Sequence, residues 1–447
     1  MGADPTPRPA PVLARPAAPT PIRRAWFREE VVGSLWFVPI CFVVGALALS
    51  RLTIVLDTNW GNDLPPDVLL PGDVAAVSDT MGVIAAAMLT FLGLVLSATL
   101  IAVQLASSQY SPRIVRIFVR SPLTKVTVGM FLATFVFALN ALVGIRHTGA
   151  ASAPAATVSI AYLLVLATLV VFVFYLHGIV KLLRVQYLLQ HTGRDAYEVL
   201  DAEFPPADAY HDATAPDPAL PSRGMEFHGN TGVLQVIDLG GLAEAAEARG
   251  CWVEMLVAVG EHVSPHTPLA AIHGPDPSAL PDGAVTAHLL FGQVRTLQQD
   301  PAFGLRQLVD TASRALSPAI NDPTTAVQAL NVVLDLLARI ADRPDPTGWY
   351  TSRSGAVRVR LRDDSFERLA QLALTEILRY GQGAPQVTRR LAAAYDELDR
   401  LVDNGPEGPH RREVIRALRA QFDQAVGDCC DAAFVDVATR PDRMGLG

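Results

Sequence analysis

Small and polar side chains recur at helical spacing through one long apolar segment. At about 100° per residue, they fall within an arc of about 100° on one helical face. The face consists of Asp79, Gly82, Ala86, Thr90, Gly93, Ser97, Gln104, Ser108 and Ser111. Lipid hydrocarbon cannot hydrogen-bond hydroxyl or amide groups, so we expect this face to be turned toward protein or water.

Two interpretations of this face remain open, and they can hold together on one helix. Gly82, Ala86 and Thr90 follow the small-xxx-small spacing that lets helix backbones approach closely, which predicts a packing seam. Alternatively, the faces of several copies converge on an axis and line a water-filled path, with Gln104 and Ser108 at its cytoplasmic end. No ring of carboxylates is evident in the middle of the segment, so the pattern does not indicate a strongly charge-selective filter.

A second group of polar residues lies at the centre of a predicted helical hairpin, residues 303–340. Asp322, followed by a proline, has the chemistry of a helix N-cap, and Ser317 with the next proline ends the preceding helix. A capped turn accounts for these residues. The alternative is a small-ligand or ion site built from Asp310, Ser317, Asn321 and Asp322.

Residues able to hold a metal or perform catalysis show no familiar pattern. The spacing of His262, His266 and His273 matches no zinc motif, and the cysteines form no metal spacing. No lysine follows Lys181, which excludes a phosphate-binding G-K-[ST] loop from the second half, and metalloprotease, hydrolase and dinucleotide motifs are absent. We expect no cofactor, no metal and no enzymatic activity.

Composition points to a membrane part joined to a soluble part. Half of the residues are hydrophobic and only 18% are charged, so the composition is too apolar for an ordinary soluble protein. A chain of 447 residues is also too long for one domain. The formal net charge of −8 argues against a nucleic-acid partner.

Four apolar segments reach the length of about 20 residues that a bilayer requires. They are Val31–Leu52, Thr80–Ser107, Leu123–Ile145 and Thr157–Val180. Basic residues gather before the first, between the second and third, and after the fourth, which predicts that both termini are cytoplasmic. We therefore expect a protein of the bacterial plasma (inner) membrane with a cytoplasmic C-terminal domain.

The expected fold class is a membrane α-helical part with four transmembrane helices, followed by a cytosolic α+β region. The domain predictions are, in order, a disordered Pro-rich tail (1–25), a four-helix transmembrane domain (26–200), a linker (201–223), a small β-rich subdomain (224–282), a mostly helical domain (283–437) and a tail (438–447).

The β-rich subdomain contains GEHVSPHTPLAAIHG, Gly260–Gly274, which resembles the turn-and-strand of lipoyl or biotinyl barrel-sandwich folds. His266 stands where that pattern has its second glycine. Because no lysine follows Lys181, a swinging-arm carrier is excluded, and the resemblance implies only a related small β-fold.

Two further stretches carry a wider resemblance, VQLASSQYSPRI in the membrane part and RALSPAINDPTTA in the hairpin. Together they resemble the bacterial membrane protein family catalogued as domain of unknown function 2254, over roughly residues 25–435. The resemblance implies four spans followed by a cytosolic β-then-α region, and the family supplies no established activity.

The continuous polar face favours a homo-oligomeric ion channel or transporter with a cytosolic regulatory domain. Its expected partners are the lipid bilayer and further copies of itself. The alternative is a membrane-anchored sensing or scaffolding protein without transport activity.

Overall fold

The computed structural model describes the chain in two compact units. One unit spans Phe27–Leu188 and is here called the bundle; the other, here called the α/β unit, combines Leu189–Gly447 with Met1–Trp26. The described residues are 11–16, 34–60, 74–109, 121–148, 155–182, 184–362, 364–405 and 407–429.

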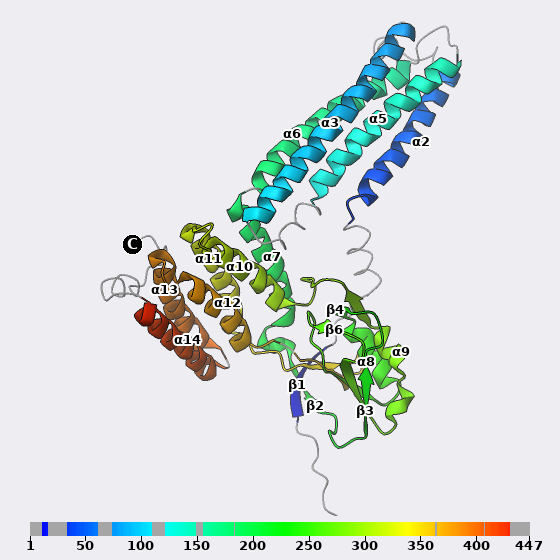
Figure 1. The fold of residues 1–447 in the computed structure, drawn as a ribbon. Coiled ribbons are helices and arrows are strands. Elements are labelled where there is room, and N and C mark those ends of the chain that lie inside the picture. The colour runs from blue at the N-terminus through cyan, green and yellow to red at the C-terminus, as the bar shows by residue number, and fades with distance from the viewer. Residues whose placement is uncertain are drawn as a thin grey trace, which may run out of the picture. The chain divides into compact units, whose positions relative to one another are not determined.

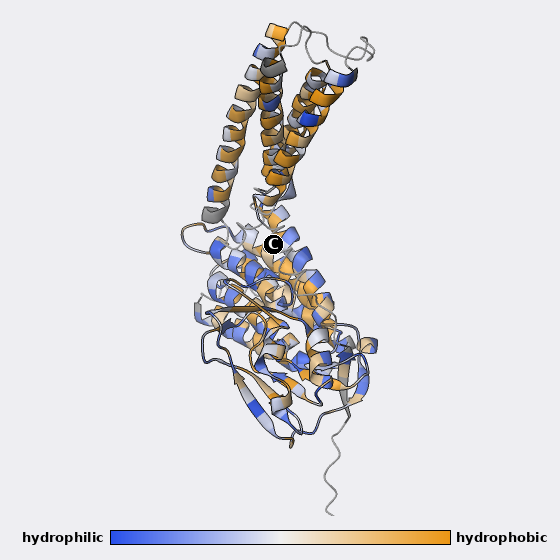
Figure 2. Ribbon diagram, turned by 90° about the vertical axis from the view of Figure 1, so that its right-hand side faces the viewer, coloured by the Kyte–Doolittle hydropathy of each residue, from blue (hydrophilic) through white to orange (hydrophobic). Residues whose placement is uncertain are grey.

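Four long helices form the bundle (Figure 1). They are α2 (Phe37–Trp60), α3 (Val74–Gln109), α5 (Pro122–Thr148) and α6 (Ala155–Leu182). All four are long and apolar enough to cross a membrane, and Figure 2 shows hydrophobic residues along their whole length. The prediction of four membrane helices is confirmed.

Helix α5 is the centre of the bundle. It packs against each of the other three helices, and half of its apolar window is buried, compared with 22–28% for the others. The remaining helices therefore each leave a broad apolar face to the surroundings, as lipid-facing helices do.

Polar contacts join the bundle helices inside and at one end. The Asn140 side chain donates to Ser50 Oγ, so this intramembrane amide has the packing role that such residues often serve. Asp57 of α2 accepts from Ala156 N at 2.8 Å and Thr157 N at 2.9 Å, which satisfies free amides at the start of α6. Helix α2 ends at Trp60 rather than at Leu52, where the sequence pattern predicted its end, so the Asp57 contact lies within this additional part of the helix.

The α/β unit contains two sheets. The larger has the order β2-β1-β9-β10-β5-β7-β3, and the smaller has the order β6-β4-β8. The strands are β1 (Pro11–Pro16), β2 (His211–Thr214), β3 (Ser222–Glu226), β4 (Gly232–Ile237), β5 (Trp252–Met255), β6 (His262–Val263), β7 (Pro268–His273), β8 (Leu289–Gly292), β9 (Trp349–Thr351) and β10 (Val357–Arg360).

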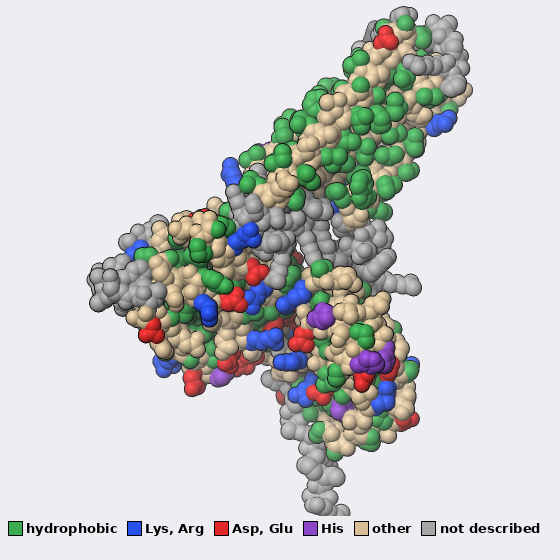
Figure 3. Space-filling view, viewed as in Figure 1, with side chains coloured by type: hydrophobic (Ala, Val, Ile, Leu, Met, Phe, Trp, Pro, Cys, Tyr) green, Lys and Arg blue, Asp and Glu red, His purple; other side chains and the backbone are tan. Residues whose placement is uncertain are grey.

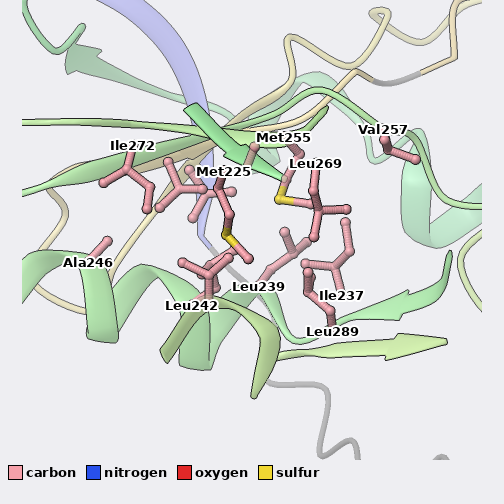
Figure 4. Packing of buried hydrophobic residues seen from close by; sticks show 14 of the residues in the cluster. Met225, Ile237, Leu239, Leu242, Ala246, Met255, Val257, Leu269, Ile272 and Leu289 are labelled. Carbon is pink, nitrogen blue, oxygen red and sulfur yellow. The ribbon is translucent and has the colours of Figure 1, made fainter. Parts of the chain in front are cut away.

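The core of the β part lies between the two sheets and two short helices, α8 (Leu239–Glu247) and α9 (Asp282–Thr286). Strands β5 and β7 contribute Met255, Leu269 and Ile272 to it, while Leu242 and Ala246 approach from α8 (Figure 4). Burial of these side chains, at about 25 cal/mol per Å² of apolar surface, holds the sheets together.

The turn that resembles the barrel-sandwich pattern has left-handed backbone at two positions, Gly260 with φ 87° and His266 with φ 69°. These are the first two glycine positions of the pattern. A residue with a Cβ atom is strained at such positive φ values. The His266 N–H donates a 2.8 Å hydrogen bond to Phe227 O, and this bond helps to keep His266 in the strained conformation.

Six longer helices complete the α/β unit. They are α7 (Val185–Glu203), α10 (Pro301–Ala315), α11 (Pro323–Ile340), α12 (Phe366–Gly381), α13 (Pro385–Leu401) and α14 (Gly408–Cys429). Helices α10 to α13 are strongly amphipathic, so their apolar faces meet in a second core. A cohesive mixed region therefore follows the membrane helices, as predicted.

The predicted disorder of residues 1–25 is wrong for Pro11–Pro16, which form β1; the rest of that segment lies outside the described residues. Composition suggested too little apolar surface to pack, but β1 pairs antiparallel with β2 and parallel with β9 through its backbone. A strand inserted between two others needs little apolar surface of its own.

The predicted linker and subdomain borders also differ from the structure. The unit border falls after Leu188 rather than near residue 200, and the linker 201–223 includes the end of α7, all of β2 and the start of β3. Strands β9 and β10, from the region predicted as mostly helical, join the large sheet beside β5. The β and helical parts therefore interleave along the chain. The predicted tail 438–447 lies outside the described residues.

Candidate functional sites

The polar face of α3 points away from the bundle. Val77, Met81 and Met88 form the opposite, buried face. Gly82 is half-buried, and the exposed members are Asp79, Ala86, Thr90, Gly93, Ser97 and Gln104. Ser108 belongs to α3, but its side chain lies outside the described residues, as does all of Ser111. In Figure 3, a strip of tan backbone and non-hydrophobic side chains runs along the bundle between green hydrophobic side chains.

There is room for another backbone against this face. A Cβ atom built on Gly82 or Gly93 meets no atom of the chain within 4 Å. The Thr90 hydroxyl donates to Ala86 O at 3.0 Å, which satisfies it within its own helix. The small residues therefore do not serve packing within one copy of the chain, and both interpretations of this face require something outside the bundle.

The hairpin turn is built as a helix cap. The Asp322 carboxylate accepts from Thr325 N at 3.1 Å and from Thr325 Oγ1 at 2.6 Å, and a proline occupies the first position of α11. Asn321 precedes it with φ 49°, a value that asparagine tolerates well. The capping interpretation is confirmed.

The other residues of the turn contribute locally. Ser317 Oγ donates to Arg314 O at 2.7 Å, and Asn321 N donates to Ser317 O at 2.9 Å, which together close the end of α10. Asp310 is half-buried on α10, about two helical turns before Ser317. A ligand role for Asp310, Ser317, Asn321 and Asp322 stays a prediction.

A charged cavity that the sequence reasoning missed lies within the α/β unit. It has a volume of about 100 Å³ and is here called the Arg295 cavity. Three parts of the chain far apart in sequence form most of its wall: the loop 257–261 after β5, residues of 295–302 at the start of α10, and Leu361, Arg362, Asp364 and Arg368, which follow β10 and reach the first turn of α12. Glu203 and Phe204, at the end of α7, complete it together with Ile237, Leu239 and Pro346.

Asp300 anchors one side of the cavity. Its side chain is only 2% exposed, caps α10 by accepting from Phe303 N at 2.9 Å, and receives two hydrogen bonds of 2.8 Å from Arg295. Gly260 lies against this pair, since a Cβ atom there would be 2.0 Å from Asp300 Oδ2. Both oxygens of Asp300 are therefore occupied.

Asp364 is the second buried carboxylate of the cavity. Its side chain is 14% exposed and pairs with Arg368 at 3.1 Å, one helical turn later in α12. Burial raises the pKa of both Asp364 and Asp300, and the neighbouring arginines offset this only in part. Carboxyl groups with raised pKa values in a cavity are frequent features of functional sites.

The sequence gives only a weak local signal for this cavity. Asp300 before Pro301, and Ser365 before Phe366, read as helix caps, and both do cap their helices. Nothing in that pattern indicates that Arg295, Asp300 and Asp364 share one cavity, because their segments meet only through the tertiary fold.

Comparison with known proteins relates the chain to a family of predicted membrane proteins. The model of a family described as predicted membrane protein, domain of unknown function 2254, matches residues 32–397. Uncharacterised proteins of Mycobacterium bovis and Mycobacterium tuberculosis are each 28% identical over 447 residues, which covers 94% of this chain and 84% of theirs. No solved structure matches.

Proposed function

The chain belongs to that family of predicted membrane proteins, and from this premise we propose that it is a homo-oligomeric ion channel or transporter. In this proposal the α3 faces of several copies meet around a shared axis. The α/β unit acts as a cytosolic regulatory domain, and the protein resides in the bacterial inner membrane.

The observation that carries the proposal is the exposure of the polar α3 face on the isolated bundle. Lipid offers no partner to the Gln104 amide, which is exposed near the end of α3, or to the Ser97 hydroxyl nearer its middle. Another copy of the chain, or water held between copies, offers both. The open space beside Gly82 and Gly93 would let a second helix approach closely.

Orientation is part of the proposal and rests on the basic residues that flank the spans. Lys181 is exposed at the last turn of α6, next to the α/β unit in sequence. Helix ends and loops that carry positive charges tend to stay on the cytoplasmic side of the membrane. This tendency would place both termini in the cytoplasm.

The test is ion flux through liposomes that contain the purified full chain. Ser97→Leu and Gln104→Leu should suppress flux while the oligomer stays assembled, because a large apolar side chain dewets a narrow polar path. Cys41→Leu is the matched control, since Cys41 is exposed on α2, away from the α3 face. It should leave flux unchanged.

Two results would redirect the proposal. If Gly82→Leu, Ala86→Leu and Ser97→Leu all prevent assembly, the face is a packing seam between copies rather than the wall of a path. If the unmodified protein gives no flux over a range of ions and of solution conditions on its cytosolic side, the channel proposal fails. A membrane-anchored sensor, which the Arg295 cavity would suit, then becomes the better account.

A further inference from the structure

One end of the helical part of the α/β unit carries exposed apolar side chains. Ile320, in the turn between α10 and α11, is 37% exposed, and Tyr380, in the last turn of α12, is 56% exposed. The two segments lie side by side, since a Cβ atom built on Gly381 would be 3.3 Å from Leu316 Cδ1. The exposed residues of this end, here called the apolar tip, are Pro318, Ala319, Ile320, Arg379 and Tyr380.

The apolar tip lies at the end of the α/β unit where the chain arrives from the membrane helices. Helix α7 runs beside α11, because a Cβ atom built on Gly193 would be 2.5 Å from Val332 Cγ1. Eight residues further along α7 and seven further along α11, Asp201 pairs with Arg339 at 3.1 Å, so the two helices run in the same direction. Counted back from Gly193 and Val332 at 1.5 Å per residue, α7 begins at Val185 after about 12 Å and α11 begins after about 14 Å. The turn before α11 is therefore about level with the start of α7.

The connection along the chain keeps this end of the unit near the bilayer. Helix α6, which is long and apolar enough to cross a membrane, ends at Leu182, and α7 begins at Val185. Three residues of chain span at most about 10 Å, so the start of α7 lies close to the end of a membrane span. A surface tethered this closely meets the bilayer at a high effective concentration, and a small contact is then enough to dock it.

The chemistry of the apolar tip suits the boundary between lipid headgroups and acyl chains. Ile320 supplies an aliphatic side chain, and Tyr380 supplies the amphipathic ring that is enriched at this depth. Arg379 is exposed and has no ion-pair partner among the residues that the structure describes, so its charge is available to an anionic headgroup. The carboxylate of Asp322, the acidic residue of the turn, is occupied as the cap of α11.

We propose that the apolar tip docks on the surface of an anionic bilayer, with Ile320 and Tyr380 at the headgroup boundary and Arg379 paired with lipid phosphate. Docking would hold the helical part at the membrane through a second point, in addition to the covalent link through α7. A protein partner suits the tip less well, because a stable protein–protein interface buries about 800 Å² on each side, far more than five side chains supply. This docking does not depend on whether the protein transports ions.

The experiment uses the full chain in nanodiscs of phosphatidylcholine mixed with phosphatidylglycerol, and in nanodiscs of phosphatidylcholine alone. A nitroxide spin label is attached to Ala319→Cys in a background without the native cysteines. Oxygen concentrates in lipid and a nickel chelate stays in water, so docking should make the label more accessible to oxygen than to the chelate. The same label on Asp342→Cys, an exposed position just beyond the other end of α11, is the matched control and should report water. Both leaflets of a nanodisc have the same lipids, so the result does not depend on the orientation of the chain.

Variants of the apolar tip complete the test. Arg379→Gln should lower the ratio of docked to undocked protein about fivefold in the anionic nanodiscs, the factor that one basic group near an anionic surface contributes. Arg353→Gln, at an exposed arginine of the β part, should leave the ratio unchanged. Ile320→Glu should abolish docking, because a carboxylate is repelled by anionic headgroups and does not enter the acyl region. Hydrogen exchange of the unlabelled protein gives a second measurement, and residues 316–323 should exchange more slowly in the anionic nanodiscs than in the neutral ones.

Three results would overturn the inference. One is that the label on Ala319→Cys is as accessible to the nickel chelate as the label on Asp342→Cys. Another is that the label is shielded from both oxygen and the chelate, which would show that protein, either a second copy or another part of this chain, covers the tip. The third is that docking persists undiminished in Ile320→Glu. Docking of equal strength in the two lipids would overturn the part assigned to Arg379.

Discussion

Arg15, near the end of β1, donates a 2.7 Å hydrogen bond to the carboxylate of Glu203, the last residue of α7. The same guanidinium donates to the backbone oxygens of Ala202 at 3.0 Å and Glu203 at 2.8 Å. The strand that precedes the first membrane helix is thus fastened to the helix that follows the fourth. Both chain segments that lead into the bundle are held within the α/β unit.

Replacing Arg15 with alanine should destabilise the α/β unit by about 1–3 kcal/mol, because Arg15 is buried and its acceptors would lose their partners. A urea titration of the full chain in detergent, followed by tryptophan fluorescence, measures this. Arg353→Ala, at an exposed arginine, should change stability by less than about 0.5 kcal/mol. Equal stability of the two variants would show that β1 contributes little to the sheet.

Removing the cap of α11 should also be measurable. Asp322→Ala should cost about 0.5–2 kcal/mol because Thr325 N loses its acceptor, while Asp322→Ser, which keeps a capping oxygen, should cost little. Thermal unfolding of both variants tests this. If neither variant is destabilised and both lose function, the turn has a ligand role and the cap is incidental.

The strained turn at His266 offers a stabilising substitution. His266→Gly should gain about 1 kcal/mol, since glycine adopts φ 69° without strain and the His266–Glu226 contact is exposed. His262→Gly is the control on the neighbouring strand β6, where glycine should instead cost about 0.5–1 kcal/mol. Chemical denaturation separates the two. A loss of stability in His266→Gly would mean that its ring contacts matter more than the backbone strain.

Stability of the α/β unit should depend on the charge of Asp364. Burial raises its pKa in the folded state above that of the unfolded chain, Glu261 adds to this, and Arg368, Arg295 and Arg362 oppose it. The folded state therefore holds the proton more tightly, and stability falls as pH rises from the unfolded pKa of about 3.9 through the raised folded value.

Asp364→Asn removes this titration. The unfolding free energy of the unmodified protein, minus that of the variant, should be largest near pH 4. This difference should decrease as the pH rises toward neutral. Urea titrations of both proteins at a series of pH values measure it. A difference that grows as pH rises would show that the arginines, rather than burial, govern Asp364.

Orientation can be tested with single cysteines in a background that lacks the four native ones. A cysteine at Asn62, between the first two spans, should react with a membrane-impermeant thiol reagent in intact cells. A cysteine at His410, whose side chain is 63% exposed on the α/β unit, should react only after the cells are broken. The opposite pattern would place the α/β unit outside the cytoplasm.

The sequence by itself determined whatever depends on neighbours along the chain. The four membrane helices follow from runs of apolar residues, the α3 face follows from helical periodicity, and the Asp322 cap follows from side chains three residues apart. Each of these features depends on residues within a single helix. The helical repeat of about 3.6 residues per turn determines which side chains share a face.

Only the tertiary structure decided which elements meet. The insertion of β1 beside β9 joins residues more than 300 positions apart, as Arg15 opposite Tyr350 shows, whereas the Pro/Ala-rich composition of that segment suggested disorder. The Arg295 cavity likewise exists because three loops converge, which places Asp364 beside the Arg295–Asp300 pair and buries it. Long-range strand pairing and the burial of charge depend on packing across the whole unit, and no local pattern of residues encodes either one.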